Sequence, residues 1–138
     1  MAKSIEHQTV EAFNQCLDDG NIDGAFELMT EDVTFRVIGS HPELSRVFTG
    51  KQDILENLWL KVFKHLDLSK GTVPVRLTIK NIVTADGIAF RQSSGSGLGR
   101  SGMPYNNEYV HVYLFRDNKI CSVTEYLDTD LLNRLMEQ

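Results

Sequence analysis

Two residues in the C-terminal part of the chain, Glu125 and His111, have side chains that can move a proton. Glu125 lies in the run Lys119–Leu127, which has the composition of a β-strand. Alternation along a strand places Glu125 on one face with three apolar residues, Cys121, Val123 and Leu127. A carboxylate in such surroundings is either desolvated, which makes it a stronger proton acceptor, or paired with a hydrogen-bond donor. The first case suits a general base and the second a structural residue.

His111 lies among aromatic residues in the preceding run, Tyr109–Phe115. A histidine there is either a core residue whose ring nitrogens are satisfied within the protein or a functional group. In the second case it could donate a hydrogen bond to a carbonyl oxygen or relay a proton. The sequence leaves both interpretations open.

The turn at Asp117-Asn118 decides which residue lies opposite Glu125. A two-residue turn would place Val110 there, whereas a three-residue turn with a left-handed, bulged Asn118 would place Tyr109 there. In the second register, the face of Glu125 would also carry Asn107, Tyr109, His111 and Tyr113. Polar groups that converge in an otherwise apolar cavity are typical of a small-molecule site.

The elements that would position these residues fall into two halves, helices first and strands after them. Apolar periodicity and capping residues predict helices over residues 5–17, 21–29, 51–66 and 129–136, with Ser4 and Asp128 as N-caps and Gly20 as a helix stop. Alternation predicts strands over residues 33–38, 73–79 and 88–94, besides the two strands of the 105–128 stretch. This order indicates a single α+β domain over residues 1–138.

One motif, Gly97–Gly102, matches the G-x-G-x-x-G pattern of dinucleotide-binding loops. That pattern needs a strand before it and a helix after it, so that the pyrophosphate meets the amides of a helix N-terminus. Here a strand follows the glycines instead. We therefore interpret the segment as a flexible connection that would form a rim over a pocket.

Composition and charge narrow the classes of partner. The net charge of −5, the pI near 5.3 and the lack of a Lys/Arg cluster argue against binding to nucleic acid. The apolar runs are too short to span a membrane and the first residues lack a signal-peptide pattern, so we expect a cytoplasmic protein. Cys16 and Cys121 share no metal or redox spacing and are expected to be reduced core residues. His7 and His65 share no spacing with an acid or a cysteine, so we expect no metal site.

Three stretches resemble the nuclear transport factor 2-like superfamily, and in particular its SnoaL-like, ketosteroid isomerase-like branch: residues 21–35, Phe48–Ile54 and Tyr109–Asp128. The resemblance implies a cone-shaped, curved antiparallel sheet wrapped around about three N-terminal helices, with a short C-terminal helix and a pocket at the open end. It also favours the three-residue turn. It leaves the activity open, because the superfamily includes isomerases, cyclases, dehydratases, epoxide hydrolases and non-catalytic binders.

The catalytic positions of limonene epoxide hydrolases match this sequence poorly. Their base carboxylate corresponds to Glu125. Their Arg and Asp partners correspond to Ser93 and Gly95, and their Tyr and Asn correspond to Phe35 and Val37. The resemblance therefore carries over the base and none of its partners.

Ketosteroid isomerases match no better. Their oxyanion-binding Tyr corresponds to Phe13, their base Asp to Val37 and their second oxyanion acid to His111. The resemblance thus implies a pocket, and its chemistry has to come from a set of residues that is particular to this chain.

We expect a small, apolar or partly oxygenated ligand, and two functions are open for its pocket. One is an isomerase, cyclase or hydrolase without cofactor or metal, in which Glu125 moves a proton while Tyr109 and His111 hydrogen-bond the oxygen on which charge develops. The other is a non-catalytic binding or interaction module with a structural Glu125. The ligand-binding residues that we expect are Phe13, Phe35, Val37, Trp59, Phe63, Ser93, Asn107 and Leu127.

The opposite face of the same strands predicts an assembly. This face presents Val110, Val112 and Leu114 with Ile120, and beside them Ser122, Thr124 and Tyr126. We expect the helices to cover only the concave face, so that this convex face would leave an apolar patch in water. Such a patch normally marks an interface. We therefore expect a homodimer through Val110, Val112 and Leu114.

Overall fold

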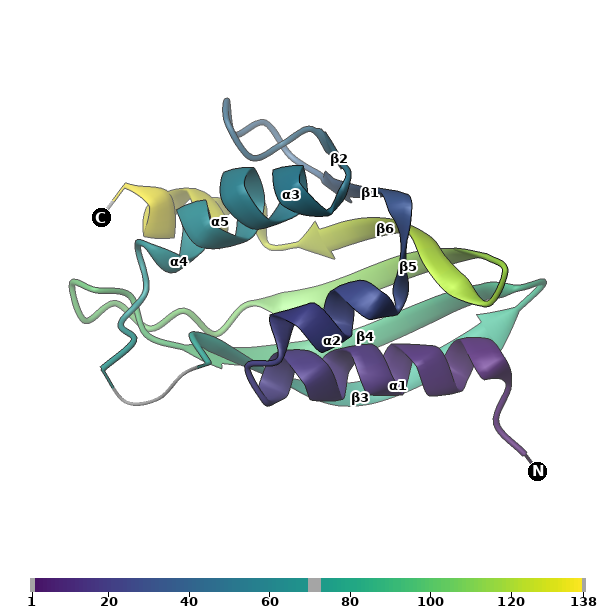
Figure 1. Cartoon of the computed structure of the whole chain (residues 1–138). Helices are drawn as coiled ribbons and strands as arrows, with labels where there is room; N and C mark the ends of the chain where they lie inside the picture. Colours follow the sequence, from purple (N-terminus) through teal and green to yellow (C-terminus); the bar gives the residue numbers. More distant parts are fainter. Residues whose placement is uncertain (1, 70–72, 138) are drawn as a thin grey trace.

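The computed structural model describes residues 2–69 and 73–137 (Figure 1). Its helices are α1 (Ile5–Asp18), α2 (Ile22–Glu27), α3 (Lys51–Asp53), α4 (Leu60–Phe63) and α5 (Thr129–Met136), with a π-helical turn η1 (Ile54–Trp59) between α3 and α4. Its strands are β1 (Met29–Val37), β2 (Val47–Thr49), β3 (Val75–Ala85), β4 (Ile88–Gly97), β5 (Glu108–Arg116) and β6 (Lys119–Leu127). The expected α+β order is confirmed. None of the helices in the described residues is long and apolar enough to cross a membrane.

The strands form one curved six-stranded sheet in the order β2-β1-β6-β5-β4-β3, and the helices cover one of its faces (Figure 1). Strand β1 runs parallel to β6, so this sheet is mixed, whereas its other strand pairs are antiparallel. The short edge strand β2 is not among the strands that the sequence predicts. It forms because Phe48, which is fully buried, pairs with Phe35 of β1.

Local signals begin and end the first two helices. Ser4 Oγ accepts a backbone N–H of the first turn of α1, and Gly20 follows the end of α1 with a φ of 71°. Asn21 caps α2 by accepting the backbone N–H of Gly24. Helix α2 ends before the predicted boundary, because the chain enters β1 at the fully buried Met29.

The third helical segment runs from Lys51 to Phe63 and changes its pitch in the middle. In η1 the Leu60 backbone N–H donates to the Leu55 carbonyl oxygen, five residues earlier. Leu58 of this wider turn lies in the core, and Trp59 lines the cavity described below. Single π-helical turns inside α-helices are frequent at functional sites.

The turn between β5 and β6 contains two residues, not the three that the resemblance favours. Asp117 and Asn118 have φ values of 53° and 63°, as in a type I′ turn, and Arg116 pairs with Lys119. The predicted left-handed conformation of Asn118 is confirmed. The predicted turn length is wrong, because the second left-handed residue, Asp117, closes the turn without a third.

A bulge at Cys121 adds one residue to β6 between the pairs Leu114–Ser122 and Phe115–Ile120. On the turn side of this bulge, Ile120 faces the core and is fully buried, with Phe115 packed against the core beside it. The predicted position of Ile120 on the convex face is therefore wrong, because the bulge reverses the alternation there.

Beyond the bulge, Glu125 lies opposite His111, which neither of the two registers considered above places there. The turn alone would have paired Glu125 with Val110, and the extra residue of the bulge shifts the pairing by one. Because side chains alternate with a period of two, the face that Glu125 shares with Tyr109 and His111 is nevertheless the predicted one.

The glycine-rich segment after β4 does not form a rim over the cavity. The backbone N–H of Arg100 donates to the His65 carbonyl oxygen, and its guanidinium donates to the Lys64 carbonyl oxygen. These bonds fasten the segment to the chain just after α4. Residues 98–104 contribute nothing to the lining of this cavity, so the expectation of a rim is wrong for it. Arg100 lines a second pocket, together with Lys64 and Leu68.

We predict that Asn118→Gly stabilises the protein by a few tenths of a kcal/mol to about 1 kcal/mol, because a type I′ turn prefers glycine at this position. The β3–β4 hairpin is the matched control. There Asp86 and Gly87, with φ values of 54° and 74°, already have the preferred sequence, so Gly87→Asn should destabilise by a similar amount. Urea unfolding measures both effects, and a loss of stability in Asn118→Gly would contradict the assigned turn.

Candidate functional site

Four strands place one residue each in a row across the concave face of the sheet. Arg91 of β4 pairs with His111 of β5, His111 with Glu125 of β6, and Glu125 with Val37 of β1. Side chains that lie directly opposite on one face of a sheet are neighbours. The register therefore brings a guanidinium, an imidazole and a carboxylate together in this order.

Hydrogen bonds join this row to helix α1. Arg91 Nη1 donates to Asn14 Oδ1 at 2.9 Å, and Arg91 Nη2 lies 3.0 Å from His111 Nδ1. His111 Nε2 lies 2.8 Å from Glu125 Oε1. Asn14, Arg91 and His111 are at most 6% exposed, whereas the Glu125 side chain is 18% exposed. This chain of hydrogen bonds thus runs from the interior to a carboxylate that lines the cavity.

Burial and charge favour the neutral form of His111. Burial lowers the pKa of His111 below its ordinary value of 6.5, and the Arg91 guanidinium lowers this pKa further. The hydrogen bond and charge of Glu125 raise the pKa, but these effects are smaller. His111 is therefore neutral at neutral pH.

Two tyrosines of β5 flank His111. The centre of the His111 ring lies 5.5 Å from that of Tyr109 and 6.1 Å from that of Tyr113, with the rings stacked. Burial raises the pKa of Tyr113 to about 12 and that of Tyr109 well above its ordinary value of 10. Both hydroxyl groups therefore stay protonated near neutral pH, and Tyr109 lines the cavity with a group that can donate a hydrogen bond.

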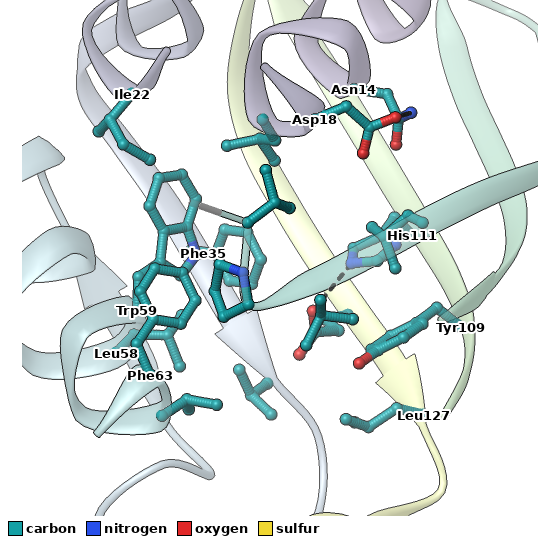
Figure 2. Close-up of a pocket in the computed structure, with 18 of the residues that line it drawn as sticks. Asn14, Asp18, Ile22, Phe35, Leu58, Trp59, Phe63, Tyr109, His111 and Leu127 are labelled. Atoms are coloured by element: carbon teal, nitrogen blue, oxygen red, sulfur yellow. Dashed lines mark hydrogen bonds and ion pairs between the residues drawn. The ribbon is translucent and has the colours of Figure 1, made fainter. Parts of the chain in front are cut away.

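The row borders a cavity of about 340 Å³ between the sheet and the helices. Figure 2 shows Trp59, Phe35 and Phe63 on the side opposite Tyr109 and His111. The Trp59 ring meets Phe35 edge-on with 6.3 Å between ring centres, which fixes its orientation in the aromatic wall. An aromatic wall that faces a few polar groups is typical of a small-molecule site.

The structure gathers most of the predicted site residues around this cavity. Those that line it are Glu125, His111, Tyr109, Phe13, Phe35, Val37, Trp59, Phe63 and Leu127. The Glu125 side chain is largely buried and contacts His111, as its apolar surroundings in the sequence indicate. Both ring nitrogens of His111 are engaged within the protein. The predicted donation from His111 to a ligand oxygen therefore does not fit, and His111 holds Glu125 instead.

Two predicted ligand-binding residues, Ser93 and Asn107, do not line the cavity. Asn107 Oδ1 accepts the backbone N–H groups of Glu108 and Asp128, and its Nδ2 donates to the Asp128 carbonyl oxygen. These bonds tie the start of β5 to the junction of β6 and α5, so the amide is used for the fold. Ser93 is fully buried at the position paired with Tyr109.

Sequence reasoning misses Arg91 and Asn14. Arg91 follows the apolar Phe90 on β4, and the sequence pattern would place the arginine in solvent and the phenylalanine in the core. The structure shows the reverse, since Phe90 is 40% exposed and Arg91 only 1%. A usable signal is the run of small residues that share the face of Arg91, namely Ala89, Ser93 and Gly95. They leave room for the large rings of β5, and they mark the crowded concave face.

Other residues that the sequence draws attention to have structural roles. His41 Nδ1 accepts the backbone N–H groups of Glu43 and Leu44, and Asp128 caps α5. Cys16 and Cys121 are free, half-buried thiols. In residues 2–69 and 73–137, no group of three or more His, Cys, Asp or Glu side chains is placed to hold a metal ion.

A family model described as a SnoaL-like domain matches residues 10–123. The chain belongs to the SnoaL-like family. This confirms the resemblance to the SnoaL-like branch that the sequence carries. No curated protein matches the chain significantly.

Several solved structures share the fold of this chain. The chain is similar to a protein of unknown function from Burkholderia pseudomallei, with a TM-score of 0.84, 17% identity and coverage of 99% of this chain and 100% of that one. A protein from Burkholderia thailandensis has a TM-score of 0.81, 14% identity and coverage of 99% and 100%. TerC, co-crystallised with polyporic acid, has a TM-score of 0.79, 21% identity and coverage of 98% and 100%. Identities this low show the fold alone.

We predict that the free energy of unfolding falls as the pH is lowered from about 7 to about 5.5, in part through His111. Folding lowers the pKa of His111, so the unfolded chain takes up a proton as the pH passes below 6.5 while the folded protein does not. One such proton changes the stability by up to about 1.4 kcal/mol per pH unit. The loss levels off below the pKa of the folded state.

His111→Gln should weaken this pH dependence, because glutamine can accept from Arg91 and donate to Glu125 without titrating. His65→Gln, which replaces a half-buried histidine outside the site, is the control and should keep it. Urea unfolding across this pH range measures the difference. An equal pH dependence in wild type and His111→Gln would contradict a buried, neutral imidazole.

Proposed function

We propose that this SnoaL-like chain is a cofactor-independent enzyme that isomerises, cyclises or hydrolyses a small, largely apolar molecule with an oxygen function. Glu125 transfers the proton. The observation that carries the proposal is the 2.8 Å hydrogen bond from His111 to Glu125 at the polar side of a largely apolar cavity. It fixes one carboxylate oxygen and leaves the side chain in reach of a ligand. A general base needs this combination of fixed position and access.

The second oxygen of Glu125 supports this role. Within residues 2–69 and 73–137, the hydrogen bond to the Glu125 side chain reaches Oε1, and Oε2 receives none. An anchored carboxylate presents its other oxygen in a defined direction. This reduces the orientational freedom that has to be lost before proton transfer.

The proposed step removes a proton from a carbon next to a carbonyl group of the ligand. The proton goes to Glu125, the C–H electron pair forms a C=C bond, and the carbonyl π electrons move to the oxygen. The protonated hydroxyl group of Tyr109 donates to that oxygen. Return of the proton to another carbon completes an isomerisation. In a cyclisation the carbanion attacks a second carbonyl carbon of the ligand, and the oxygen of that carbonyl takes the π electrons and then the proton from Glu125. In a hydrolysis Glu125 removes a proton from bound water, the hydroxide attacks an electrophilic carbon of the ligand, the bond from that carbon to a leaving oxygen breaks, and this oxygen takes the proton from Glu125.

The cavity favours flat, apolar ligands. Its wall opposite Tyr109 consists of aromatic side chains, among them Trp59, Phe35 and Phe63, and its volume of about 340 Å³ suits a molecule at the small end of the usual ligand range. Because the similar TerC was co-crystallised with polyporic acid, that compound is a reasonable first test ligand.

The second candidate function is a non-catalytic binding protein. The same hydrogen bond favours it, since the link from His111 to Glu125 also holds β5 against β6. The two functions make different demands on Glu125. A base is needed for turnover, whereas a structural residue is needed only for stability.

We predict that Glu125→Gln lowers turnover by at least about a hundredfold while the fold and ligand binding persist. Glutamine can still accept the hydrogen bond from His111, but it cannot take up a proton. Ligands are recovered from the purified protein by mass spectrometry and tested beside polyporic acid. Binding is followed by the fluorescence of Trp59, which is the one tryptophan of the chain and lines the cavity.

Glu108→Gln is the matched control for this experiment, because Glu108 is an exposed carboxylate at the start of β5. It should leave turnover and binding unchanged. Undiminished turnover in Glu125→Gln, with binding intact, would remove Glu125 as the base. Bound ligand without turnover in the wild type would leave the binding protein as the function.

We also propose that the chain forms a homodimer through the convex face of the sheet. Side chains between 38% and 59% exposed on this face are Val83, Phe90, Val110, Leu114 and Tyr126. Cross-strand pairing sets Phe90 beside Val83 and Val112, and Val110 beside Tyr126, so the patch is continuous. The helices cover the other face (Figure 1), which leaves this face available to a second copy.

Val112→Glu should shift the mass measured by light scattering from dimer toward monomer, because it places a charge in the middle of the apolar patch. Gln8→Glu adds the same charge on the exposed side of α1 and should leave the mass unchanged. A wild-type protein that remains monomeric at high micromolar concentration would contradict the proposed dimer.

A further inference from the structure

The contact between Arg91 and His111 determines where the imidazole carries its proton. A guanidinium group has donors and no acceptor. Because Arg91 Nη2 lies 3.0 Å from His111 Nδ1, this ring nitrogen is the acceptor and has no proton. In the neutral imidazole the proton is then on Nε2, which donates to Glu125 Oε1 at 2.8 Å.

We propose that Arg91 is a positioning residue that fixes His111 in the neutral tautomer with its proton on Nε2. The chain of hydrogen bonds then ends at Glu125, and Glu125 is the group that accepts a proton from a ligand. The catalytic part of this inference rests on the proposed function, whereas the tautomer of His111 does not.

Arg91 is itself held from the side of α1. Its Nη1 donates to Asn14 Oδ1, and this orients the amide so that Asn14 Nδ2 points to Asp18 Oδ2 at 3.5 Å. The guanidinium carbon of Arg91 also lies 5.6 Å from the centre of the Tyr113 ring. With 1% of the residue exposed, the guanidinium has little freedom to turn away from His111.

The surroundings of His111 leave no favourable place for a second ring proton. The groups that face it are Arg91 from β4, Glu125 from β6, Tyr109 and Tyr113 from β5, Asn14 with Asp18 behind it from α1, and uncharged Phe35 and Val37 from β1. In the other neutral tautomer, the N–H of Nδ1 would point at an N–H of Arg91. In the cation, two positive charges would in addition lie 3.0 Å from each other. Arg91 therefore opposes both the other tautomer and the cation.

This arrangement defines the fate of the transferred proton. Once Glu125 has taken a proton from the ligand, His111 cannot accept it, because Nε2 already carries a proton and Arg91 occupies Nδ1. Glu125 therefore keeps the proton until it returns it to the ligand. A histidine with a free ring nitrogen would instead pass the proton on.

Nuclear magnetic resonance of the ¹⁵N-labelled protein at neutral pH tests the tautomer without any substrate. Two-bond ¹H–¹⁵N correlations distinguish protonated from unprotonated ring nitrogens, and we expect the neutral form with the proton on Nε2 for His111. His41, whose Nδ1 accepts two backbone N–H groups, is an internal reference for this tautomer. The pattern of the other tautomer or of a cation at His111 would overturn the proposal.

Three variants separate hydrogen bond from charge. Arg91→Met removes both and should raise the pKa of His111 by about one unit or more and mix its tautomers. Arg91→Gln keeps an N–H donor without the charge, so it should raise the pKa and retain the tautomer. Arg76→Met, at an exposed arginine of β3, should change neither.

An unchanged titration and tautomer of His111 in Arg91→Met would overturn the role of Arg91. If that variant does not fold, Arg91→Gln and the wild-type tautomer decide the matter. The proposed function can fail separately. Full turnover in Glu125→Gln, together with the expected tautomer of His111, would reject Glu125 as the base and keep Arg91 as the group that orients the imidazole.

Discussion

The structure depends on how one buried guanidinium is compensated. Arg91 is 1% exposed, and an uncompensated charge at this depth would cost several kcal/mol. Compensation comes from Asn14 on one side and, through the imidazole of His111, from the carboxylate of Glu125 on the other. Removing one member of such a buried set typically costs about 3–5 kcal/mol. The contacts that orient a proton acceptor are therefore the same ones that hold α1, β4, β5 and β6 in place.

This compensation requires a particular strand register, and two local features of the β5–β6 hairpin produce it together. The type I′ turn alone would set Val110 opposite Glu125 and send the Glu125 side chain to the convex face, away from Tyr109 and His111. The bulge at Cys121 returns the Glu125 side chain to the concave face and brings His111 opposite it. A bulge that re-aims side chains beside a site is a recurring device in sheets. In this chain it decides whether the hydrogen bonds can form at all.

The face of the site and most of the cavity lining could be predicted from the sequence, because alternation and apolar composition are local properties. The pairing of Glu125 with His111 could not, since no residue type marks Cys121 as the bulge. Arg91 escapes prediction for a different reason. Its burial is favourable only with Asn14, 77 residues earlier in the chain, and Glu125 placed around it, and a pattern along one strand does not contain those contacts.

The same crowding bears on Ser93 and Gly95, the positions that the resemblance matches to the Arg and Asp partners of limonene epoxide hydrolases. A Cβ atom at Gly95 would lie 3.0 Å from Tyr109 Cε2, closer than side chains normally approach, and Ser93 is fully buried at the position paired with Tyr109. A large charged side chain at either position would displace the Tyr109 ring, which stacks on His111. The Tyr109 ring in its present position and a large charged side chain at position 93 or 95 therefore cannot be present together. The positive charge that accompanies the Glu125 carboxylate comes instead from Arg91, which lies two residues before Ser93 on β4. The imidazole of His111 lies between the guanidinium and the carboxylate, and it holds the carboxylate at the cavity.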